Sequence, residues 1–129
     1  MLVTMGVLAC SGAHRAHEER TLPDVTLTQE DKGRSIAVAV GQTIAINLRE
    51  NPSTGFRWAM EQGNDKILEP LAATYVQEPG STVGQGGVRI WEFKAAKEGS
   101  VRLAFKLWRA WEGDASLAER FDVMIESRQ

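Results

Sequence analysis

The amino-acid sequence predicts an all-β fold, a sandwich of seven or eight short strands, and three observations support this prediction. From Leu22 onward, apolar residues alternate with polar ones at a period of two, as in strands that bury one face. Glycine-containing turns separate these runs at the short spacing of β-sandwiches. No stretch shows a convincing helical period.

The composition indicates a soluble, globular chain and excludes several function classes. The 129 residues suffice for one domain, and 43% of them are hydrophobic while 25% are charged. The net charge of −2, without any Lys/Arg block, gives no basis for nucleic-acid binding. No uninterrupted apolar run is long enough to span a membrane.

The distribution of cysteine and histidine argues against an enzyme. Cys10 is the single cysteine, so the sandwich has no intrachain disulfide. Both histidines, His14 and His17, lie in a polar N-terminal segment. The remaining chain therefore offers neither a Cys-His nor a Ser-His pair for nucleophilic catalysis, and a zinc site made of carboxylates alone is not expected. We expect no catalytic residues, no metal and no cofactor.

Residues 1–21 read as a signal remnant followed by a flexible tether, and residues 22–129 as the folded domain. Leu2–Ala9 is mostly apolar and ends in Val-Leu-Ala-Cys, which resembles the lipobox of bacterial lipoproteins. That resemblance implies lipidation of Cys10, and we expect the chain either in the periplasm of a bacterial cell envelope, held there by the lipid, or secreted. No basic segment precedes the apolar stretch. The alternative is a hydrophobic N-terminus with a chance cysteine.

The strands expected in the domain follow the apolar alternation in chain order. They are centred on Val25–Leu27, Ile36–Val40, Ile44–Leu48, Phe56–Met60, Ile90–Phe93, Val101–Leu107 and Phe121–Ile125, and two short apolar pairs, Ile67-Leu68 and Tyr75-Val76, flank Pro70. Gly41-Gln42 separates the second and third runs, which predicts a hairpin between them. Trp58 and Trp91 fall on inward positions and are expected in the core.

Three loops contain residues that a simple connection between strands does not require. In the first, Pro52 restricts Asn51 to an extended conformation, and Gly55 permits a backbone angle that other residues resist. The second, residues 78–87, has four glycines but lacks the lysine and helix of a phosphate-binding loop. The third carries Trp111 between Ala110 and Glu112, where an exposed tryptophan is a frequent interface anchor.

Together these loops resemble the chagasin family of cysteine-peptidase inhibitors. The motifs are Asn-Pro-Ser-Thr-Gly-Phe at 51–56, Gly-Gln-Gly-Gly at 84–87 and Arg-Ala-Trp at 109–111, in the family's order and spacing, and Glu119–Val123 resembles its last strand. The likeness covers about residues 22–126. It implies an immunoglobulin-like β-sandwich whose three loops lie side by side at one end.

The resemblance also implies a function and a site. The chain would be a reversible inhibitor of papain-like cysteine peptidases, occluding the cleft without being cleaved, and would act as a monomer. Thr54 would lie next to the catalytic cysteine, Val83 at the S2 pocket, and Trp111 on the primed side. The implied contact residues are Asn51, Pro52, Ser53, Thr54, Gly55 and Phe56; Thr82, Val83, Gly84, Gln85, Gly86 and Gly87; and Arg109, Ala110, Trp111 and Glu112.

One residue departs from the family pattern, because Ala110 stands where the third loop usually has proline. A less restricted backbone there could cost about 0.4–1 kcal/mol of pre-organisation. The competing interpretation of the whole chain is an envelope-anchored immunoglobulin-like binding or adhesion module without inhibitory activity. It explains the sandwich and the tether, but not three matched loops.

Overall fold

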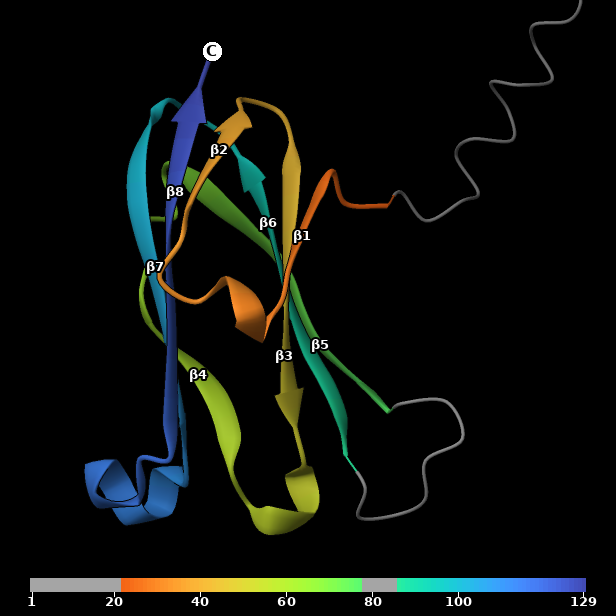
Figure 1. Cartoon of the computed structure of the whole chain (residues 1–129), viewed down its shortest axis with the longest axis vertical. Helices are drawn as coiled ribbons and strands as arrows, with labels where there is room; N and C mark the ends of the chain where they lie inside the picture. The colour runs from red at the N-terminus through yellow and green to blue at the C-terminus, as the bar shows by residue number, and fades with distance from the viewer. Residues whose placement is uncertain (1–21, 78–85) are drawn as a thin grey trace, which may run out of the picture.

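The computed structural model describes residues 22–77 and 86–129, which form two packed four-stranded sheets (Figure 1). Three short 3₁₀ segments, η1 (Gln29–Asp31), η2 (Pro52–Thr54) and η3 (Ala110–Ser116), are the only helical turns among these residues. The strands are β1 (Val25–Leu27), β2 (Ser35–Ala39), β3 (Thr43–Glu50), β4 (Arg57–Gln62), β5 (Leu68–Gln77), β6 (Gly87–Ala95), β7 (Gly99–Trp108) and β8 (Glu119–Arg128). The predicted disulfide-free immunoglobulin-like sandwich is confirmed.

The strand order is β1-β3-β6-β5 in one sheet and β2-β8-β7-β4 in the other. The pairs β1–β3 and β2–β8 are parallel, whereas the other neighbours are antiparallel. Consecutive strands therefore often lie in opposite sheets, and the connections between them gather at the two ends of the sandwich (Figure 1).

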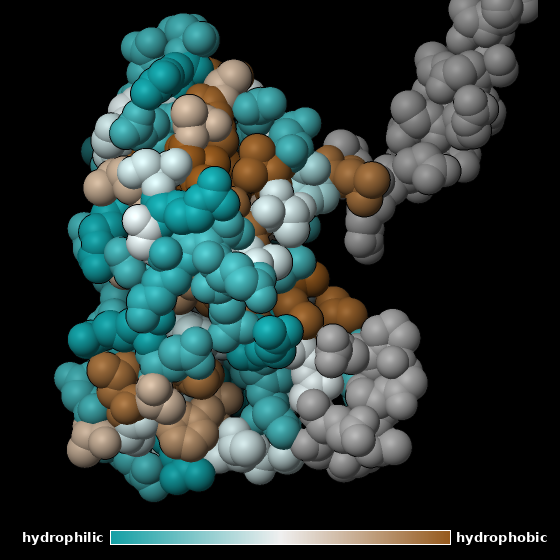
Figure 2. Space-filling view, viewed as in Figure 1, coloured by the Kyte–Doolittle hydropathy of each residue, from teal (hydrophilic) through white to brown (hydrophobic). Residues whose placement is uncertain are grey.

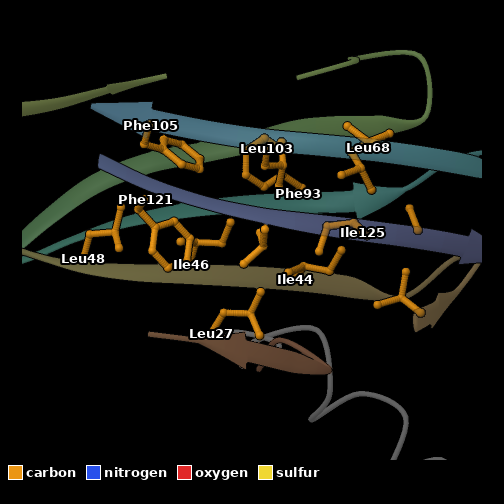
Figure 3. Packing of buried hydrophobic residues seen from close by; sticks show 14 of the residues in the cluster. Leu27, Ile44, Ile46, Leu48, Leu68, Phe93, Leu103, Phe105, Phe121 and Ile125 are labelled. Carbon is orange, nitrogen blue, oxygen red and sulfur yellow. The ribbon is translucent and has the colours of Figure 1, made fainter. Parts of the chain in front are cut away.

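The core consists of the inward residues of both sheets (Figure 3). The Phe105 ring lies between Trp91, at a centroid distance of 5.1 Å, and Phe121, at 6.3 Å. The expected inward positions are confirmed for Trp58, which is buried, and Trp91 is partly buried against the core. The large side chains that are fully buried are Phe93, Phe105, Phe121, Ile44, Ile46, Leu48, Leu68, Leu103, Ile125 and Val123.

The hairpin expected around Gly41 is wrong. β2 pairs with β8, whereas β3 lies between β1 and β6 in the other sheet. Gly41, at φ 99°, carries the chain across the end of the sandwich, and its N–H donates to the Ala95 carbonyl at 2.7 Å. Pairing of β3 with β6 is favoured over a local hairpin with β2, because β3 forms an antiparallel ladder with β6 along its entire length.

Met60 keeps the inward phase of Trp58, because it lies opposite the buried Phe105 of β7, but 40% of it is exposed on this edge strand. The pairing of β4 with β7 shifts register between Met60 and Gln62, which ends the regular alternation at this edge strand. Within the ranges that the structure describes, no helix has the length and apolar character needed to cross a membrane.

Candidate functional site: three loops at one end of the sandwich

The β3–β4 loop, which contains η2 (Pro52–Thr54), lies with the β7–β8 loop at the end of the sandwich opposite the C-terminus (Figure 1). Its shape is fixed from within. The Asn51 carboxamide oxygen accepts hydrogen bonds from the Ser53 N–H at 3.1 Å and the Ser53 hydroxyl at 2.8 Å. Gly55 closes the turn at φ 84°, a conformation that favours glycine. The first loop is thus a pre-shaped turn on a strand.

Thr54 contributes its hydroxyl to the same turn. This hydroxyl donates to the Asn51 carbonyl at 2.7 Å and accepts from the Phe56 N–H at 3.3 Å. The residue is nevertheless exposed to solvent. Thr54 therefore lies at the surface, while its hydroxyl group forms hydrogen bonds within the loop.

The β7–β8 loop forms η3 (Ala110–Ser116), and a serine side chain ties its two ends together. The Ser116 hydroxyl accepts from the Arg109 N–H at 2.9 Å and can donate to the Gly113 carbonyl at 2.7 Å. Trp111 projects from this loop with 71% of its surface exposed. The expectation that Trp111 lies outside the core is confirmed.

The first and third loops contact each other directly. Arg109 Nε donates to the Thr54 carbonyl at 3.1 Å, and its guanidinium carbon lies 4.4 Å from the centroid of the Phe56 ring. A methyl group added at Gly55 would lie 2.7 Å from Cη2 of Trp111, so the indole packs closely over this glycine. Both loops therefore form one surface in the free protein.

Of the glycine-rich loop, Thr82, Val83, Gly84 and Gln85 lie outside the described residues. Its last two residues adjoin the first loop. Gly87 pairs with Glu50 in the β3–β6 ladder, and a Cβ at Gly86 would lie 3.0 Å from the Glu50 carbonyl. A hollow of about 290 Å³ opens where these loops meet, lined by Arg49, Glu50, Asn51, Thr54, Phe56, Gly87, Leu107 and Ala118.

Below the loops lies a buried ion pair that sequence reasoning missed. Glu50 is 3% exposed, and its Oε2 lies 2.6 Å from Nη2 of Arg89. The signal was present in the sequence, because Glu50 continues the inward series of Ile46 and Leu48, and Arg89 precedes Trp91 in the same phase. Two opposite charges at inward positions of neighbouring strands predict a buried pair.

Within residues 22–77 and 86–129, no group of three or more His, Cys, Asp or Glu residues could hold a metal ion. The loop end offers a surface ordered by internal hydrogen bonds, with Trp111 exposed, and apolar residues lie next to hydrophilic ones at this end of the molecule (Figure 2). This arrangement is suited to binding another protein.

Comparison with known proteins shows the family of the chain. Residues 37–125 match the model of the family described as chagasin family peptidase inhibitor I42. The chain belongs to this family. Members of the chagasin family are inhibitors rather than enzymes, so the chain is a protein inhibitor of peptidases.

Individual relatives agree with the assignment. Chagasin of Trypanosoma cruzi is 27% identical over 105 residues, which cover 78% of this chain and 96% of that protein. Amoebiasin-2 of Entamoeba histolytica is 29% identical over 87 residues, 67% of this chain and 71% of that protein. The crystal structure of an E. histolytica cysteine protease inhibitor shares the fold, with a TM-score of 0.70 at 23% identity, and the match covers 82% of this chain and 99% of that one.

Proposed function

We propose that this chagasin-family chain reversibly inhibits papain-like cysteine peptidases by filling their active-site cleft. The observation that carries the proposal is the joint surface of the first and third loops, where exposed Trp111 packs over Gly55 beside Thr54. The similarity to inhibitors described as acting on cysteine proteases supports the choice of target class.

In this proposal each loop occupies a different part of the peptidase's active-site cleft. Thr54 lies next to the catalytic cysteine, Val83 fills the S2 pocket, and Trp111 covers the primed side, as the family resemblance implies. Contacts from Asn51–Phe56, from residues 82–87 and from Arg109–Glu112 flank these three. The fixed turn of the first loop supports inhibition without cleavage, because a closed turn does not present an extended peptide bond for attack.

The pre-organised loops favour tight binding. Internal hydrogen bonds of Asn51 and Thr54 and the clamp of Arg109 on the Thr54 carbonyl order the surface before any partner arrives. Little conformational entropy is then lost on association. An interface of standard size, about 1,600 Å² in total, suffices for stable inhibition.

Titration of papain with the purified chain tests this function, with the serine peptidase trypsin as the control enzyme. We expect inhibition of papain by a monomeric chain in a 1:1 complex and no inhibition of trypsin. Absence of papain inhibition at micromolar concentrations would favour the rival interpretation as a binding or adhesion module.

Gly55→Ala should weaken papain inhibition by more than its effect on folding explains. Alanine at φ 84° is strained by about 1–2 kcal/mol, and its methyl group would also displace Trp111. Gly33→Ala is the matched control, since φ is 81° there and no atom lies within 4 Å of the added methyl. Chemical denaturation should give similar stability losses for both variants, whereas inhibition constants should change for Gly55→Ala alone. Equal inhibition by the two variants would contradict the proposed role of Trp111 on this loop.

Ala110→Pro should stabilise the protein by about 0.4–1 kcal/mol and modestly tighten inhibition. Ala110 is the first residue of η3, where a proline removes no helical hydrogen bond, and Arg109 before it is already extended at φ −100° and ψ 109°. Ala118→Pro is the contrast, because it would delete the N–H that bonds the Leu107 carbonyl at 2.8 Å. Thermal melts of both variants check this; a destabilised Ala110→Pro protein would show that the native backbone excludes proline.

We further propose that Cys10, which lies outside the described residues, is lipidated and holds the inhibitor in a bacterial cell envelope, on the periplasmic side. The Val-Leu-Ala-Cys sequence supports this. The start of β1 supports it too, because Asp24 bonds Thr43 at the end of β3 remote from the loops, so an anchor there would leave the loops accessible. Intact mass spectrometry of protein from the native cell decides: an unmodified Cys10 on a soluble chain contradicts the proposal.

A further inference from the structure

The buried Glu50–Arg89 pair joins the roots of the loops. Glu50 is the last residue of β3, directly before the first loop, and its side chain is fully buried. Arg89 reaches it with two donors, Nη2 to Oε2 at 2.6 Å and Nε to Oε1 at 3.3 Å. A two-point Arg–carboxylate contact fixes orientation as well as distance.

Glu50 also closes the root of the first loop. Its Oε1 accepts the backbone N–H of Trp58 at 2.9 Å, so the residue before the loop holds a residue just after it. The Trp58 indole N–H returns to the Arg49 carbonyl at 2.7 Å. Trp58 in turn pairs with Leu107 of β7, close to the start of the third loop.

Arg89 makes the corresponding contact between the strands that flank the glycine-rich loop. It lies two residues after Gly87, where that loop ends, and its guanidinium carbon is 5.5 Å from the centroid of the Tyr75 ring. Tyr75 faces Arg89 in the β5–β6 ladder, on the strand that leads into the loop. The contacts Trp58–Glu50–Arg89–Tyr75 thus connect β4, β3, β6 and β5, the strands that flank the first and the glycine-rich loops, and the pairing of Trp58 with Leu107 extends this chain of contacts to β7, which leads into the third loop.

We propose that Glu50 and Arg89 are positioning residues for peptidase inhibition, setting the three loops in register without touching the peptidase. This inference rests on the proposed function. A buried ion pair is not needed for packing, because hydrophobic replacements of similar volume are often as stable. A two-point charged contact, unlike a pair of apolar side chains, fixes one relative position of the strands it joins.

The experiment separates positioning from stability. The variants are Glu50→Gln, Arg89→Met and the double variant Glu50→Leu/Arg89→Met, in which an apolar pair replaces the charged one. The control is Arg128→Gln, which removes an exposed ion pair with Glu126 near the C-terminus, at the end away from the loops. Urea denaturation gives stability, and association and dissociation rates with papain give affinity, at a temperature where every variant is folded.

We expect the single variants to be destabilised and the double variant to regain most of the lost stability. The double variant should still dissociate from papain at least about tenfold faster than the wild type, a measurable difference in affinity. Wild-type affinity in the double variant would overturn the proposal, since it would show that packing alone suffices. Should the double variant not fold, Arg89→Lys applies the same test, because lysine keeps the charge but loses the two-point contact.

A second readout needs no peptidase and keeps this inference distinct from the proposed function. Amide hydrogen exchange in the free double variant should be faster at Thr54–Phe56, at the tip of the first loop, and unchanged in the control. If the wild type fails to inhibit papain, the proposed function fails. If the wild type inhibits papain but either affinity or loop-tip exchange is unchanged in the double variant, the positioning role fails while the function stands.

Discussion

Replacing Thr54 with arginine is expected to lower affinity for papain at least about a hundredfold, a loss of about 2.7 kcal/mol. The proposed function puts this residue beside the catalytic cysteine, where the cleft is narrowest. Arginine there adds bulk and a charge that the complex would bury without a partner, which is costly. The measurement is an inhibition constant for papain together with a urea denaturation curve.

Stability should change much less than affinity for Thr54→Arg. The two hydrogen bonds of the Thr54 hydroxyl are exposed, so their loss should cost no more than about 1.5 kcal/mol each. Thr54→Ser is the matched control, since it keeps the hydroxyl and should inhibit nearly as well as the wild type. A fall in stability of Thr54→Arg that matches its fall in inhibition would mean that the stretch is only a structural turn.

Trp111→Ala is expected to weaken papain binding by at least about 2 kcal/mol, or roughly thirtyfold, with folding nearly intact. The side chain is 71% exposed and packs over Gly55 rather than in the core, so little burial is lost in the free protein. The loss should be seen mainly as faster dissociation, as is usual for truncation at an interface.

Trp58→Ala provides the contrast for this prediction. Trp58 is 4% exposed and belongs to the core, where truncation of a tryptophan costs about 3–5 kcal/mol of stability. Paired thermal melts should therefore show a large shift for Trp58→Ala and a small one for Trp111→Ala. A large melting shift for Trp111→Ala with unchanged affinity would show that the third loop is not a binding loop.

The strands could be predicted from the sequence because each sheet of a sandwich buries one face. Apolar residues therefore recur at every second position along a strand. Leu103 and Phe105 on β7, or Ile44 and Ile46 on β3, alternate in the chain and are all fully buried. The exposed position of Trp111 was also predictable, because the residue stands in a loop outside any alternating run. The three loop motifs predicted the family, which the family match confirms.

Other features could not be obtained from local patterns. The turn at Gly41 looks like a hairpin locally, and only the long-range pairing of β3 with β6 decides that it crosses between sheets. Contacts such as the Arg109 clamp on Thr54 join residues 55 positions apart, which no spacing in the sequence reveals. The exposure of Met60 follows from the place of β4 at the edge of its sheet, which the local alternation does not reveal. By contrast, the Glu50–Arg89 pair could have been predicted from the sequence, because both charges fall at inward positions of their strands.

The most direct test of occlusion by the loops is to incubate the chain with papain whose catalytic cysteine is free, and with papain whose cleft is already filled by a covalent active-site ligand. Binding is measured by calorimetry, and both chains are weighed afterwards by intact mass spectrometry. The account predicts 1:1 binding to free papain, no binding to the filled enzyme, and an uncut inhibitor after prolonged incubation. Equal binding to the filled enzyme, or cleavage of the chain with return of papain activity, would contradict it.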